Sequence, residues 1–112
     1  MTNQLDSFFS AISDPTRRAV IERLTQGPAS VSALHAPHDI ALPTFLRHLK
    51  VLEDSGLVRS HKSGRVRTVH IEAVPLAQAE GWLNRQRTLW EGRLDRLDAF
   101  LADMPEQETS HD

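Results

Sequence analysis

The stretch that decides the fold is LPTFLRHLKVLEDSGLV, residues 42–58. Pro43 suits the first turn of a helix, where a backbone N–H is not needed. Ser55-Gly56 predicts the end of that helix, because glycine readily adopts the left-handed conformation that follows many helices. The side chains that recur at helical spacing, and that we expect to be buried, are Phe45, Leu49 and Leu52. The opposite side then carries Leu46, Arg47, Lys50 and Glu53.

Three shorter helices are predicted before this one. Residues 4–12 carry an apolar stripe that needs a packing partner. A second helix begins at residues 14–16, where an aspartate and a proline form a strong start signal, and it ends at residues 27–28. A third helix is capped by Ser30 and stopped by Pro37. A tight link of three residues then leads into the helix at Pro43.

The hydrophobic period changes over residues 57–72, where β-branched residues alternate with basic ones around Lys62-Ser63-Gly64-Arg65. This pattern predicts a β-hairpin with a basic tip. Two short helices joined by a tight turn and followed by a basic hairpin are typical of a winged helix-turn-helix, a mainly α fold with a small β-hairpin wing. In that fold the second helix enters the major groove of double-stranded DNA. The side chains expected to contact DNA are Thr44, Leu46, Arg47, His48 and Lys50 on the helix, and Arg59, Lys62, Arg65 and Arg67 on the wing.

The distribution of charge supports a polyanionic partner. The chain of 112 residues has a formal net charge of −2, yet residues 41–70 contain six Arg and Lys side chains against two acidic ones. One basic segment in an otherwise acidic chain favours a nucleic-acid-binding face. The chain has no cysteine, which excludes disulfides and thiolate metal sites. It shows no signal peptide or membrane span, so we expect a cytoplasmic protein without membrane contact.

The last helix, from Pro75 to about residue 103, predicts a homodimer. Such a helix would be about 43 Å long, well beyond the core of one small domain, and its apolar stripe continues to Leu101. We expect one domain over residues 1–103, including the terminal dimerisation helices, and a flexible acidic tail over 104–112. The expected interface residues are Leu5, Phe8, Phe9, Trp82, Leu83, Leu89, Trp90, Leu94, Leu97 and Leu101.

The sequence SDPTRR at 13–18, the whole of 42–58 and the hairpin KSGRVR at 62–67 together resemble the ArsR family of bacterial transcriptional regulators. The resemblance extends over residues 8–71. It implies a homodimeric repressor that binds a pseudo-palindromic operator and releases it when an effector, here an unidentified small molecule, binds.

The metal sites of that family are not matched. The paired cysteines of its metal-sensing members correspond to Ser30 and Ser32, and a hydroxyl does not replace a thiolate toward soft metals. The last helix contains no histidine for the other familiar site. His35 and His38 are close in sequence, but a proline between them disfavours a shared helical face. We therefore predict no metal and no cofactor, in the branch of the family that does not sense metals.

Catalysis is not indicated, because the sequence lacks a nucleophile elbow, a phosphate-binding loop and carboxylates paired beside a histidine. An alternative to DNA binding is a protein-interaction or antirepressor module that has kept the fold. Two positions stay open in this reading. Leu46 either faces the major groove or packs against the third helix, and His48 lies between core and groove, where a structural hydrogen bond competes with a DNA contact.

Overall fold

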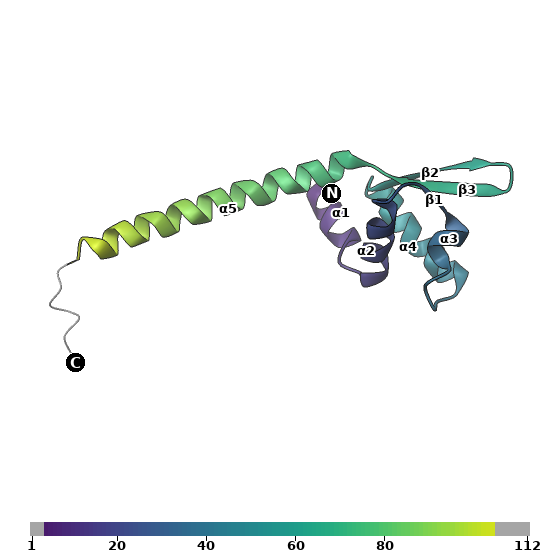
Figure 1. The fold of residues 1–112 in the computed structure, drawn as a ribbon, viewed down its shortest axis with the longest axis horizontal. Helices are drawn as coiled ribbons and strands as arrows, with labels where there is room; N and C mark the ends of the chain where they lie inside the picture. Colours follow the sequence, from purple (N-terminus) through teal and green to yellow (C-terminus); the bar gives the residue numbers. More distant parts are fainter. Residues whose placement is uncertain (1–3, 105–112) are drawn as a thin grey trace. The chain divides into compact units, whose positions relative to one another are not determined.

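The computed structural model describes residues 4–104 (Figure 1). Its helices and strands follow the predicted order with one added strand. In chain order they are α1 (Gln4–Ala11), α2 (Pro15–Leu24), β1 (Ala29–Ser30), α3 (Val31–His35), α4 (Leu42–Asp54), β2 (Val58–Ser63), β3 (Val66–Ile71) and α5 (Ala73–Ala102). The tail predicted over residues 104–112 lies outside the described part of the chain except for Met104.

Helix α4 confirms the prediction made from residues 42–58. Its expected buried positions, Phe45, Leu49 and Leu52, are all buried. Its C-terminus is closed by two backbone hydrogen bonds, from Gly56 to Glu53 at 2.9 Å and from Leu57 to Leu52 at 3.1 Å. This pattern requires a left-handed residue after the helix, and Gly56 has φ = 80°. Leu52 and Leu57 are both fully buried, so the same turn directs the chain into the core.

The predicted helix starts are also present. The Asp14 carboxylate accepts a hydrogen bond from the Arg17 backbone N–H at 3.0 Å and caps α2. The Ser30 hydroxyl accepts one from the Ala33 N–H at 3.1 Å and caps α3. Helix α4 has no side-chain cap, as Ala41 at that position dictates.

The three strands form one antiparallel sheet in the order β1-β3-β2. The hairpin of β2 and β3 turns through Gly64, whose φ of 62° favours glycine, and Arg65. Strand β1 was not predicted. It is only two residues long and pairs Ala29 with Val69, and a segment this short carries no alternating pattern that sequence analysis could detect.

The core collects buried side chains from α1 to α4, the sheet and the first turns of α5, centred on Phe45. Contacts divide the chain into two units, Met1–Ala79 and Glu80–Asp112, and the boundary lies within α5. The prediction that this helix begins at Pro75 was wrong by two residues. It begins at Ala73, because a proline in the first turn costs no helical hydrogen bond. Within residues 4–104 no helix has the length and apolar composition needed to span a membrane.

Candidate nucleic-acid interface

The outward side of α4 has the composition predicted for it. Leu46, Arg47 and Lys50 are exposed, whereas Thr44 and His48 are half-buried. Lys50 pairs with Asp54 one turn later, with 3.3 Å between Nζ and Oδ1. Because an exposed pair of this kind is weak, Lys50 can exchange its partner for a phosphate. Arg47 has no such intrachain partner among residues 4–104.

The wing has two faces, and its basic residues are divided between them. Residues directly opposite in an antiparallel pair point to the same face, so Lys62 and its partner Arg67 share a face with the buried Val58 and Val69. This face continues the side of the sheet that packs against α4. Arg59 is opposite His70 and lies on the other face, where its Nε is 3.9 Å from the Glu72 carboxylate.

A chain of hydrogen bonds connects the wing to α4. The Ser60 hydroxyl donates to the Glu53 carboxylate at 2.7 Å and accepts from the Arg67 guanidinium at 3.0 Å. Glu53 belongs to α4 and Arg67 to β3. The angle of the wing relative to the helix is therefore restrained by polar contacts as well as by the core beneath them.

A hollow of about 280 Å³ lies between α4 and this face of the sheet. Its lining includes apolar side chains, among them Val31 of α3 and Leu46, and at its rim the charged groups of Lys50 and Arg67. Leu46 is 43% exposed and so borders both α3 and the open surface. The substitution Leu46→Ser distinguishes these two environments.

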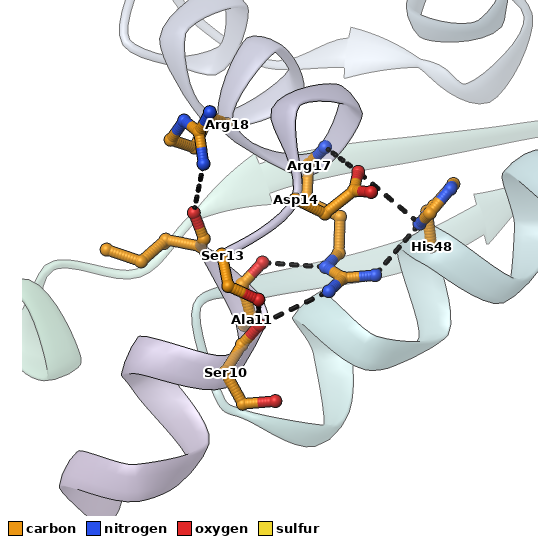
Figure 2. A network of polar contacts seen from close by, with 8 residues as sticks. Ser10, Ala11, Ser13, Asp14, Arg17, Arg18 and His48 are labelled. Carbon is orange, nitrogen blue, oxygen red and sulfur yellow. Dashed lines mark hydrogen bonds and ion pairs between the residues drawn. The ribbon is translucent and has the colours of Figure 1, made fainter.

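On the side of α4 away from the hollow, Arg17 connects three helices (Figure 2). Its Nε donates to the Ala11 carbonyl at 2.6 Å and its Nη2 to the Ser10 carbonyl at 3.2 Å, both at the C-terminus of α1. Its Nη1 lies 2.9 Å from Nδ1 of His48 on α4. His48, which was predicted to lie between the core and the groove, thus makes a structural hydrogen bond through one of its ring nitrogens.

The Asp14 carboxylate lies in the same network, 3.7 Å from His48 Nδ1. Partial burial raises the pKa of Asp14, but the hydrogen bonds from the backbone N–H groups of Arg17 and Thr16 and the positive charge of the Arg17 guanidinium lower it. The net effect is a pKa of Asp14 below its ordinary value of 3.8. The cap of α2 is therefore ionised at neutral pH.

The histidines that invite a metal hypothesis have other contacts. His35 donates from Nε2 to the Ile40 carbonyl at 2.7 Å, and both His35 and His38 pack against the Phe45 ring. They therefore shape the turn between α3 and α4. In the wing, His70 Nε2 is 3.0 Å from Glu72. In the part of the chain that the structure describes, no three His, Asp or Glu side chains converge in a way that could hold a metal ion.

The residues predicted for the dimer interface have different surroundings. Phe8 is only 6% exposed and belongs to the core of its own chain, while Leu5 and Phe9 are half-buried. In α5, by contrast, large apolar side chains are exposed along the helix. These are Trp82, Leu83, Leu89, Trp90, Leu94, Leu97, Phe100 and Leu101.

Two residues of this surface were not predicted from the sequence. Arg17 had no predicted role beyond its place in the SDPTRR sequence, and Ser60 was not predicted to connect the wing to α4. Arg17 could not be located from spacing, because its contact with His48 spans 31 positions. The contacts of Ser60 span only seven positions, but they depend on how the sheet packs against α4. A charged side chain one turn after a helix cap was the only available signal for Arg17.

The two helices α3 and α4, with α4 exposed beside a basic hairpin, define a winged helix-turn-helix protein, and the comparisons agree. Residues 12–61 match the family described as a helix-turn-helix domain. The chain is 35% identical over 80 residues to the HTH-type transcriptional regulator Rv2034 of Mycobacterium tuberculosis, covering 71% of this chain and 75% of the relative. It is 25% identical over 79 residues to the transcriptional repressor SdpR of Bacillus subtilis, covering 70% and 88%.

A crystal structure of an ArsR family transcriptional regulator shares 55% sequence identity with the chain and superposes on it with a TM-score of 0.77, covering 80% of this chain and 98% of the other. The chain belongs to the ArsR family and is a DNA-binding transcriptional regulator. The family assignment made from residues 13–18 and 42–58 is thereby confirmed.

Proposed function

We propose that the protein is a homodimeric repressor that places its two α4 helices in successive major grooves of a pseudo-palindromic operator. One observation carries this proposal, namely that the exposed side of α4 and one face of the wing present their cations on the same side of the sheet. Major-groove spacing of about 34 to 36 Å suits a two-fold dimer. We infer no catalytic role for the chain.

The contacts with DNA are divided between bases and phosphates. On α4 we assign Arg47 to guanine or phosphate, Thr44 and His48 to the flank of the helix, and Lys50 to phosphate. On the wing, Lys62, Arg65 and Arg67 bind phosphates around the turn. Arg59, on the other face and beside Glu72, contributes to the positive field without direct contact.

The dimer interface forms from α5, and Leu5 and Phe9 of α1 remain predicted contacts from the other unit of the chain. A continuous set of exposed aromatic and aliphatic side chains on one helix is unusual for a monomer, since large apolar patches mark interaction surfaces. A second copy offers the same stripe by symmetry. The domain then includes α5, while residues 105–112 of the predicted tail lie outside the described part of the chain.

We further infer that release of DNA is triggered by a small molecule and not by a thiophilic metal. Ser30, at one of the positions where the family's metal sensors have thiolates, is engaged in capping α3.

Fluorescence anisotropy with a labelled duplex from the region upstream of the protein's own gene tests this function. We expect binding that is tighter than to a random duplex of equal length and that weakens as salt rises. Sedimentation at micromolar concentration should report a dimer. Absence of salt-dependent binding to either duplex would instead identify the interaction module.

A further inference from the structure

His48 is held by a partner that can only donate hydrogen bonds. A guanidinium has five N–H groups and no acceptor, so at 2.9 Å from Arg17 Nη1 the Nδ1 atom of His48 must accept. An imidazole that accepts at Nδ1 is neutral and carries its proton on Nε2. The geometry around Arg17 thereby selects one tautomer of His48.

The neighbouring carboxylate does not reverse this selection. Asp14 lies 3.7 Å from the same Nδ1, beyond hydrogen-bond distance, and its Oδ2 already accepts the Arg17 backbone N–H at 3.0 Å. Arg17 itself cannot turn away, since two further contacts with the Ser10 and Ala11 carbonyls fix its guanidinium plane. The three contacts together make the arginine a rigid template for the imidazole.

The second ring nitrogen of His48, Nε2, then carries an N–H group that has no acceptor among residues 4–104. Figure 2 shows this nitrogen pointing away from Arg17 and Asp14. The His48 side chain is 20% exposed, so this N–H is available to an acceptor outside the chain. His48 immediately follows Arg47 on α4, the helix that enters the major groove in the proposed function.

We propose that Arg17 sets His48 as the Nε2–H tautomer and that His48 uses this N–H to donate a hydrogen bond to DNA, most simply to a phosphate oxygen. The inference rests on the proposed function for its DNA partner, whereas the tautomer is a property of the free protein. Arg17 is then a positioning residue. Through the Ser10 and Ala11 carbonyls it also couples the end of α1 to the orientation of this donor.

Nitrogen-15 NMR of the imidazole rings in the DNA-free protein tests the first half. Comparison with the His48→Asn spectrum assigns the His48 signals, and we expect the proton on Nε2. Arg17→Lys, which keeps the charge but loses the planar fork, should shift the population toward Nδ1–H, because the Asp14 carboxylate then becomes the nearest acceptor. A proton on Nδ1 in the wild type, or a tautomer population that is unchanged in Arg17→Lys, overturns the inference.

Two amide variants test the second half. His48→Gln places its amide nitrogen near the position of Nε2 and keeps the donor, whereas His48→Asn resembles the Nδ1 side and loses it. On the upstream duplex, His48→Gln should bind within about twofold of wild type. His48→Asn should bind about a hundredfold more weakly, because the dimer loses two such contacts and each hydrogen bond to a charged group contributes about tenfold. Thermal melting ensures that both variants are folded at the assay temperature.

Equal affinity of the two amide variants overturns the DNA contact while the repressor proposal stands. If the wild type binds neither the upstream nor the random duplex at any salt concentration, both the proposed function and the DNA contact of His48 are refuted. In that case the NMR measurement alone still decides whether Arg17 sets the tautomer.

Discussion

Lys62→Ala and Arg59→Ala are matched variants. Together they distinguish the effect of a cation's position on the wing from the effect of losing one positive charge. Each removes one positive charge from β2, but the two side chains lie on opposite faces of the wing. Lys62 shares the face that continues beside α4 and has no ion-pair partner among residues 4–104, whereas Arg59 lies 3.9 Å from the Glu72 carboxylate. If the face of the wing beside α4 binds phosphates, only Lys62→Ala removes phosphate contacts.

The expected size of the effect comes from counterion release. Each phosphate contact contributes about 0.9 to the slope of log affinity against log salt. The proposed homodimer has two wings, so Lys62→Ala removes two contacts and should reduce the slope by about 1.8. At physiological salt, about 0.15 M, this corresponds to roughly 30-fold weaker binding. Arg59→Ala changes only the long-range field, and its slope should change by less than about 0.5.

Fluorescence anisotropy between about 0.05 and 0.3 M salt measures both slopes. The loss caused by Lys62→Ala should be equal on the upstream duplex and on a random one, because phosphates carry no sequence information. Equal slopes for the two variants would refute the assignment of faces. A loss confined to the upstream duplex would show that the wing reads bases instead.

Three further predictions concern the dimer, the groove and the cap of α2. Trp90→Glu should convert the dimer to a monomer in sedimentation and weaken DNA binding together with it, since one half-site loses the linked second contact; an intact dimer would exclude α5 as the interface. Leu46→Ser should relax the preference for thymine at one symmetric pair of positions with little change in melting temperature if Leu46 contacts a thymine methyl. A lower melting temperature with unchanged preference would instead place it against α3. The lowered pKa of Asp14 means that its carboxylate stabilises the fold above its ordinary pKa of 3.8 and that this contribution is lost as the pH falls through the lower folded value. The melting temperature of the wild type should therefore drop more steeply below about pH 4 than that of Asp14→Asn, whose amide caps the helix without ionising; parallel curves would argue against a contribution from the charge.

The sequence by itself determined the helices, their ends and the hairpin. The cap at Asp14, the cap at Ser30 and the turn at Gly56 were all predictable, because each depends on hydrogen bonds between residues within one or two turns. The same is true of the buried side of α4, where spacing alone selects the residues that face the core.

Tertiary structure decided the contacts between distant segments. The pairing of β1 with β3, the bridge from Glu53 through Ser60 and the Arg17–His48 hydrogen bond join segments whose separation is set by how the whole core packs. The division of the wing cations between two faces depends on strand register, since a shift of one residue reverses every side chain. Local patterns identify which residues can bond, but only the packed core brings a donor on α2 within 2.9 Å of an acceptor on α4.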